Sequence, residues 1–280
     1  MSEIDPRRLQ RHVRETLRAQ SQPTRVGPFT CFFHPDAPYA ELNVAVPDDP
    51  VEGRRVPVLG QEAAGVAAVP DDDPEYALMM VEAQFRARKR VPRVELVAEC
   101  HPSWPSILEK AGFRQAASVP LLVSTEASWR SAPEVPGMLF EAVLPTTAWG
   151  TVKRYLEVQR DAFGLAMSIP DEAPHDPWSA LGIGAGVLAS IEGVAVGAGG
   201  FTAPREGLCE IRGLAVSPDA RRRGIGTFLL SALARVAHDG GIEGVVATPD
   251  GPRTARMAKR AGYVPSATLL AFTAEDAAAP

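Results

Sequence analysis

Apolar residues in the second half of the chain recur in two patterns. Short apolar runs are typical of strands, and a spacing of three to four residues is typical of helices. The runs predict strands over 138–144, 187–191, 194–201, 208–216, 245–247 and 268–272. The spacing predicts helices over about 146–163 and 225–237, and a further one that ends at 261. Because helices and strands are mixed, we expect an α/β layered unit.

The first half repeats this pattern at a displacement of 150 residues. Ala111-Gly112-Phe113 corresponds to Ala261-Gly262-Tyr263, and a helix predicted over about 75–89 precedes the first copy as 225–237 precedes the second. Both glycines are expected to end a helix, because the left-handed conformation costs glycine little. A proline-containing joint at 124–137 separates the copies. We therefore predict two domains, residues 1–130 and 131–280.

Composition agrees with two folded domains and narrows the class of protein. The 280 residues are 45% hydrophobic with a formal net charge of −5, which excludes global disorder and argues against nucleic-acid binding. Three widely spaced cysteines predict neither a disulfide framework nor a metal pair. The N-terminal sequence lacks an apolar signal core, and the weakly charged stretch 177–204 is rich in glycine. We expect a cytoplasmic protein with no membrane partner.

The sharpest motif is a basic, glycine-containing turn between a predicted strand and a predicted helix. Arg221, Arg222 and Arg223 precede the helix, where its dipole already places positive charge, so a bound anion would remove a conflict. Gly224 and Gly226 let backbone amides approach phosphate oxygens closely. The motif predicts a phosphate site. The alternative is a solvated basic turn whose glycines only shape the chain.

The corresponding window of the first half has the opposite charge, Asp71-Asp72-Asp73-Pro74-Glu75-Tyr76. Asp73 is expected to cap the following helix, with Pro74 at its first position. A phosphate would be repelled there, so only the second half is expected to bind an anionic ligand.

At the basic turn the chain resembles the GNAT superfamily of acetyl-CoA-dependent N-acetyltransferases. The family signature [QR]-x-x-G-x-[GA] is matched by RRRGIG at 221–226, and the resemblance covers 138–273 well and 25–125 more weakly. It implies two tandem GNAT-like domains, each a mixed, mostly antiparallel sheet flanked by helices, the first of them a degenerate copy.

The resemblance also implies a ligand and its binding residues. The amides of Arg223, Gly224, Ile225, Gly226 and Thr227 would hold the pyrophosphate of acetyl-CoA, and Arg221 and Arg222 would add charge. The backbone of Leu214, Ala215 and Val216 would pair with the pantetheine arm. No metal is expected.

Glu210 is the candidate general base. Strand periodicity predicts that Glu210, Arg212, Leu214 and Val216 share a face, and the spacing resembles that of GNAT members whose strand glutamate is the base. The alternative is a strand carboxylate paired with Arg212. The tyrosine that many members use as an acid is replaced by Ala258, and we interpret Tyr263 as a packing residue, so the acid is unassigned.

The sequence therefore predicts an N-acetyltransferase in which a primary amine of a small molecule or peptide attacks acetyl-CoA directly. Two alternatives stay open, a non-catalytic acyl-CoA-binding module and a nucleotide phosphate binder. Acidic clusters at 71–73 and 171–176 are compatible with a cationic amine acceptor or with simple solvation. A homodimer is compatible with the sequence.

Overall fold

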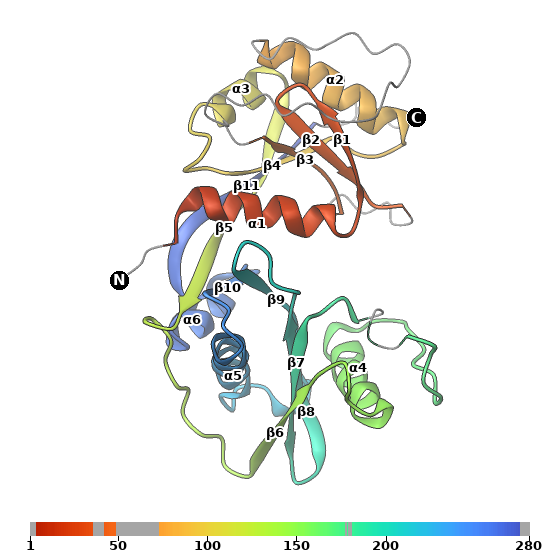
Figure 1. Ribbon diagram of the computed structural model, residues 1–280, viewed down its shortest axis with the longest axis vertical. Helices are drawn as coiled ribbons and strands as arrows, with labels where there is room; N and C mark the ends of the chain where they lie inside the picture. Colours follow the sequence, from red (N-terminus) through yellow and green to blue (C-terminus); the bar gives the residue numbers. More distant parts are fainter. Residues whose placement is uncertain (1–3, 36–41, 49–72, 177, 179–180, 275–280) are drawn as a thin grey trace. The chain divides into compact units, whose positions relative to one another are not determined.

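The computed structural model describes the chain except for residues 1–3, 36–41, 49–72, 177, 179–180 and 275–280 (Figure 1). Contacts divide it into two compact units, one built from residues 5–119 and 267–280 and the other from residues 1–4 and 120–266. The last strand thus belongs largely to the amino-terminal unit, which differs from the predicted cut at residue 130. A single boundary in the sequence cannot place the last strand in the amino-terminal unit, because the strands with which it pairs are not visible in its own sequence.

The amino-terminal unit is a mixed sheet with helices. Its helices are α1 (Pro6–Arg18), α2 (Pro74–Ala87) and α3 (Trp104–Lys110), and its strands are β1 (Gln22–Val26), β2 (Phe29–Phe33), β3 (Asn43–Pro47), β4 (Arg93–Val97), the first part of β5 (Phe113–Thr125) and most of β11 (Val264–Ala274). The strand order is β1-β2-β3-β4-β11. Only β3 and β4 are parallel among these neighbours. Side chains of α2 and α3 pack with the strands into one buried cluster around Phe29, Phe85 and Phe272.

The carboxy-terminal unit is a second mixed sheet. Its strands are β6 (Met138–Val143), β7 (Ala185–Ile191), β8 (Val194–Phe201), β9 (Leu208–Val216) and β10 (Gly244–Ala247), and its helices are α4 (Trp149–Phe163), η3 (Pro218–Ala220), α5 (Ile225–Asp239) and α6 (Pro252–Arg260). The order from the end of β5 is β5-β10-β9-β8-β7-β6, antiparallel except for β9 and β10. The predicted mixed, mostly antiparallel architecture is confirmed.

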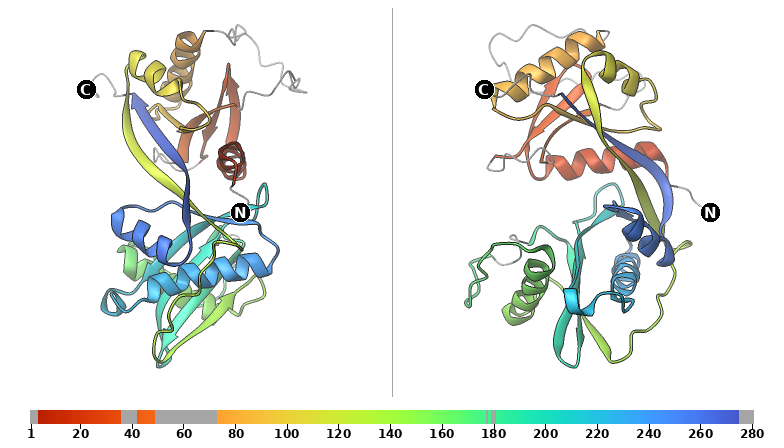
Figure 2. Two further views of the ribbon diagram at one scale, coloured as in Figure 1. Left: turned by 90° about the vertical axis from the view of Figure 1, so that its left-hand side faces the viewer. Right: turned by 180° about the vertical axis from the view of Figure 1, so that it is seen from behind.

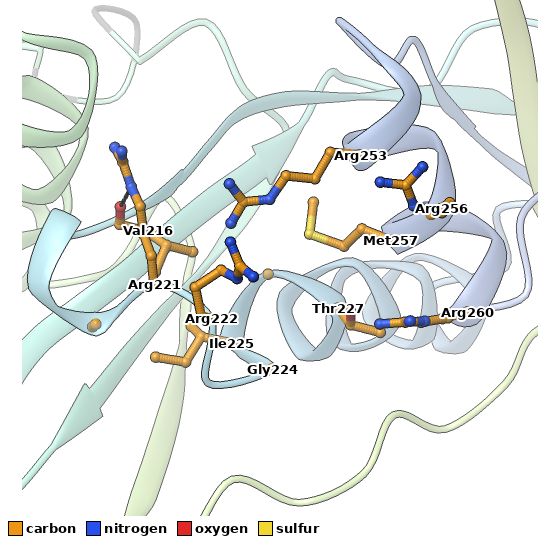
Figure 3. A pocket seen from close by; sticks show the side chains of 12 residues that line it. Val216, Arg221, Arg222, Gly224, Ile225, Thr227, Arg253, Arg256, Met257 and Arg260 are labelled. Carbon is orange, nitrogen blue, oxygen red and sulfur yellow. Dashed lines mark hydrogen bonds between the residues drawn. The ribbon is translucent and has the colours of Figure 1, made fainter.

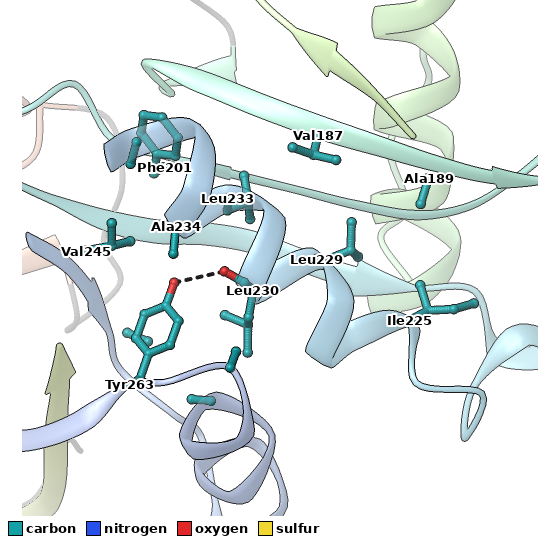
Figure 4. Close-up of a cluster of buried hydrophobic side chains, with 14 of the residues drawn as sticks. Val187, Ala189, Phe201, Ile225, Leu229, Leu230, Leu233, Ala234, Val245 and Tyr263 are labelled. Atoms are coloured by element: carbon teal, nitrogen blue, oxygen red, sulfur yellow. Dashed lines mark hydrogen bonds between the residues drawn. The ribbon is translucent and has the colours of Figure 1, made fainter. Parts of the chain in front are cut away.

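Helices cover both faces of this sheet (Figures 1 and 2). On one face α5 packs into a buried cluster with Val187, Phe201 and Tyr263, shown in Figure 4. On the other face Tyr155 and Val158 of α4 pack against Leu188 of the sheet. Membership in one cluster or the other shows whether a strand side chain points toward α5 or toward α4.

Equivalent elements recur at almost constant spacing. The pairs α2 and α5, β4 and β10, α3 and α6, and β5 and β11 begin 148 to 151 residues apart. Gly112 and Gly262 both follow a helix with positive φ, 89° and 92°. The predicted repeat and helix ends are confirmed. None of the helices within the described residues is long and apolar enough to cross a membrane.

Candidate active site

The basic turn leaves the amino terminus of α5 open. Arg222 and Gly224 both have positive φ, 71° and 88°, which turns the chain sharply between η3 and α5. Gly224 provides no capping side chain, and the first turn of α5 has no acidic residue. The backbone amides from Arg222 to Thr227 donate to no group among the described residues. Unpaired amides and a positive dipole at one helix end are suited to an anion.

The equivalent helix end in the amino-terminal unit is closed. The carboxylate of Asp73 accepts a hydrogen bond of 3.0 Å from the amide of Tyr76, and Pro74 occupies the first turn. This confirms the predicted cap. Asp71 and Asp72 lie outside the described residues. The two copies of the repeated helix therefore differ in whether their first amides are available.

A hollow of about 360 Å³ opens over the turn (Figure 3). Its lining combines the turn, the end of β9 and one face of α6: Val216, Ala220, Arg221, Arg222, Gly224, Ile225, Gly226, Thr227, Arg253, Arg256, Met257 and Arg260. Gly226 lies against Met257, so the two helices approach closely there. The hollow is strongly cationic.

The three arginines of the motif have different surroundings. The guanidinium of Arg221 donates to the carbonyls of Val216, at 3.2 Å, and Ala162, at 3.1 Å, and so links the turn to β9 and α4. The Arg222 side chain extends toward the hollow and has no hydrogen bond or ion pair with any described residue. Arg223 does not line the hollow with its side chain. Arg222 is therefore the motif's available cation.

Sequence reasoning missed the arginines that α6 adds to the hollow. Arg253, Arg256 and Arg260 lie at helical positions i, i+3 and i+7, so they share a face. That spacing was visible in the sequence. The packing of α6 beside the turn was not visible there, because it depends on the fold.

Strand β9 has an open edge leading to the turn. It pairs with β8 over most of its length, but its parallel pairing with β10 joins only residues 208–210 to residues 244–246. β10 ends at Ala247, so among the described residues no strand pairs with the β9 edge from Ile211 to Val216 on that side. A free strand edge can accept an extended ligand by backbone hydrogen bonds.

A bulge at Gly213 changes the predicted alternation of β9. Gly200 pairs with Arg212 but Ala198 pairs with Ala215, so β9 holds one extra residue there, and Gly213 has φ of 58°. Its carbonyl accepts a hydrogen bond of 2.7 Å from the Gln159 amide.

The bulge overturns the prediction that four alternate residues share a face. Cys209 and Ile211 pack in the α5-side cluster, which leaves Glu210 and Arg212 on the α4 side. Beyond the bulge Leu214 and Val216 pack on the α5 side. A bulge shifts the side-chain period by one, which periodicity alone cannot reveal.

Glu210 lies where the pairing between β9 and β10 ends. It is in register with Val246, the last pair that joins the two strands. Its carboxylate forms an ion pair of 2.9 Å with Arg212 and accepts from the Thr248 hydroxyl at 3.4 Å. The predicted alternative, pairing with Arg212, is present, and the carboxylate also borders the open strand edge.

Buried groups nearby are unsuited to acid catalysis. Ala258 is buried where many GNAT members carry a tyrosine. The Tyr263 side chain is 1% exposed and its hydroxyl donates to the Leu230 carbonyl at 3.2 Å (Figure 4). Burial raises the pKa of Tyr263 well above its usual value and that of the Cys209 thiol to about 12. Tyr263 was predicted to be a packing residue, and its burial agrees with this.

Comparison with known proteins shows which fold and which family this chain is similar to. Residues 153–263 match the Acetyltransferase (GNAT) family. A GCN5-related N-acetyltransferase from Kribbella flavida is 24% identical with a TM-score of 0.74, over 96% of this chain and 95% of that one. A tandem GNAT protein from the clavulanic acid biosynthesis pathway is 14% identical with a TM-score of 0.56, over 90% and 79% of the two chains. No curated protein matches the sequence.

The chain thus has the mixed α/β fold of GCN5-related N-acetyltransferases and resembles tandem members in its two halves. Its residues 153–263, which contain the basic turn, β9 and α6, match the model of the Acetyltransferase (GNAT) family. No group of three or more metal-ligating side chains gathers within the described residues.

Proposed function

We propose that this chain is a cytoplasmic N-acetyltransferase that uses acetyl-CoA and transfers the acetyl group to a primary amine of a small molecule or peptide. The observation that supports this most is the combination of two unsatisfied backbone surfaces in the GNAT domain. The open amino terminus of α5 is suited to a diphosphate, and the open edge of β9 leads to it from Glu210. A ligand with both a diphosphate and an extended amide-containing arm matches the two surfaces together.

The residues present fit coenzyme A. The amides from Arg223 to Thr227 would hold the pyrophosphate, with charge from Arg222 in the hollow and Arg221 at its rim. The β9 edge at Leu214, Ala215 and Val216, which faces no partner strand on the β10 side among the described residues, would hold the pantetheine arm. When bound, acetyl-CoA supplies an acyl group activated as a thioester. A β9 amide directed at the thioester carbonyl would stabilise negative charge developing on its oxygen.

Glu210 is proposed as the general base. Most amines are protonated at neutral pH, so the acceptor must lose a proton before it attacks. The Glu210 carboxylate can accept that proton, directly or through water, because it lies where the β9 edge loses its partner strand. An ordinary thiol has a pKa of about 8.5, so departure of the thiolate does not require a strong acid, which is consistent with Ala258.

The test is the variant Glu210→Gln, which keeps the side-chain size and removes the carboxylate. We expect kcat to fall by about 100-fold while acetyl-CoA binding is unchanged, as for the loss of a general base. Glu192→Gln, at an exposed turn, is the matched control. Activity equal to that of the parent between about pH 6 and pH 9 would remove Glu210 from this role.

A second candidate is a non-catalytic acyl-CoA-binding module, favoured by the buried Ala258 and by the ion pair that Arg212 makes with Glu210. Calorimetric titration with acetyl-CoA, followed by mass spectrometry of a broad amine panel, separates the two. Binding without turnover on any amine supports the module. If ADP binds as tightly as coenzyme A, the β9 edge has no part in recognition and the site is one for nucleotide phosphates.

We propose no acceptor more specific than a primary amine. Asp73 serves as a helix cap and Asp171 forms an ion pair with Lys153, so both of these acidic residues already have structural partners. Asp73 and Asp171 therefore give no reason to prefer a cationic acceptor over another amine.

A further inference from the structure

The α6 arginines are additional to what a pyrophosphate at the turn requires. Arg253, Arg256 and Arg260 line the hollow, and none of them has a hydrogen bond or ion pair with any residue that the structure describes. All three are exposed. The turn already provides unpaired amides and the free guanidinium of Arg222.

Their placement does not stabilise α6 itself. Like charges at i,i+3 and i,i+4 repel, and both spacings occur among the three. Arg253 also lies in the first helical turn, where the dipole disfavours a cation, and no acidic residue in that turn offsets it. An anion in the hollow would remove both conflicts, as it would at α5.

Coenzyme A carries a second anionic group in a suitable place. Besides its pyrophosphate, coenzyme A has a phosphate monoester on the 3′ oxygen of the ribose. This ribose separates the two anionic groups. A monoester carries a charge of about −1.5 to −2 near neutral pH and presents three acceptor oxygens. In Figure 3 the α6 arginines lie across the hollow from the turn, so one ligand can reach both groups of cations.

We propose that Arg253, Arg256 and Arg260 form a subsite for the 3′-phosphate of coenzyme A, by which the chain selects coenzyme A over dephospho-coenzyme A. The inference rests on the proposed function, since it assumes that the pyrophosphate binds at the turn. It assigns a separate role to α6, which lies outside the RRRGIG motif.

The test measures binding of coenzyme A and of dephospho-coenzyme A by calorimetry, in the full chain at fixed ionic strength. The parent should bind coenzyme A at least about tenfold more tightly, as expected for charge-assisted contacts to a phosphate. Arg256→Ala combined with Arg260→Ala should weaken coenzyme A binding by about that factor, leave dephospho-coenzyme A binding nearly unchanged, and so abolish the selectivity. Lys259→Ala is the matched control, because Lys259 is an exposed cation on α6 that does not line the hollow.

The outcomes separate the two proposals. Equal affinity of the parent for both molecules would overturn the 3′-phosphate subsite and leave the acetyl-CoA proposal standing. The same would follow if the double variant weakened both molecules equally, or if Lys259→Ala abolished the selectivity as effectively. Failure of the parent to bind either molecule would overturn both proposals.

Discussion

Replacing Arg222 with glycine should raise the stability of the free protein and weaken its binding of coenzyme A. Arg222 has φ of 71°, in a region that costs a non-glycine residue about 1–2 kcal/mol. Glycine removes this cost but adds about 0.5–1 kcal/mol of conformational entropy to be lost on folding. The net expectation is a stabilisation of roughly 0.5–1 kcal/mol. Backbone strain of this size is typical of functional sites.

The same substitution removes the available cation of the turn. The exposed Arg222 side chain has no partner among the described residues, so its charge is free for the ligand. We expect coenzyme A to bind about fivefold more weakly, since an exposed charged contact is partly screened by solvent. Stability and affinity should therefore change in opposite directions.

Thermal unfolding without ligand and calorimetry with coenzyme A measure the two effects. A gain of 1 kcal/mol corresponds to a rise in Tm of roughly 2–4 °C for a chain of this size. Glu192→Gly is the matched control, because Glu192 also has positive φ, 52°, but lies in the turn between β7 and β8, away from the hollow. It should gain stability with unchanged binding.

Two results would refute the reasoning. Unchanged coenzyme A affinity in Arg222→Gly would mean that this guanidinium does not face the ligand. A lower Tm in the absence of ligand would mean that the Arg222 side chain stabilises the turn by more than its backbone strain costs.

Two further predictions test the bulge and a buried histidine. Gly213→Ala should destabilise the protein by about 2 kcal/mol, because φ is positive and a Cβ would overlap the Gln159 amide. Gly193→Ala, with positive φ and no atom near its Cβ position, should cost less in denaturant titrations, and equal losses would contradict a specific clash. Burial, aided by the charge of Arg14, lowers the pKa of His101, so stability should fall with pH below about 6.5 as the unfolded chain takes up a proton. His101→Gln should flatten this dependence in Tm measurements between about pH 5 and pH 7.5, and an unchanged slope would exclude His101 as its source.

Local signals in the sequence were enough to predict most elements of the second half and to mark the basic turn as a candidate anion site. Arginines before a helix start and glycines at 224 and 226 lie within one short segment, so their interpretation does not depend on distant residues. The cap at Asp73 is equally local. The 150-residue displacement also predicted that the two halves share an order of elements.

The tertiary structure decided which residues meet at the site. The bulge at Gly213 moves Leu214 and Val216 to the face opposite Glu210, and it depends on pairing with β8. Strand periodicity assumes regular pairing and cannot detect an inserted residue.

The open edge of β9 and the cationic face of α6 are likewise products of packing. The edge exists because β10 ends soon after its pairing with Glu210, and the arginines at 253, 256 and 260 matter because α6 lies against the turn. The sequence by itself therefore determined which segments carry charge and where glycines leave backbone amides without covering side chains, since these properties are set within a few residues. Only the fold determined how strand register and helix packing gather them around one hollow, because those contacts join residues far apart in the chain.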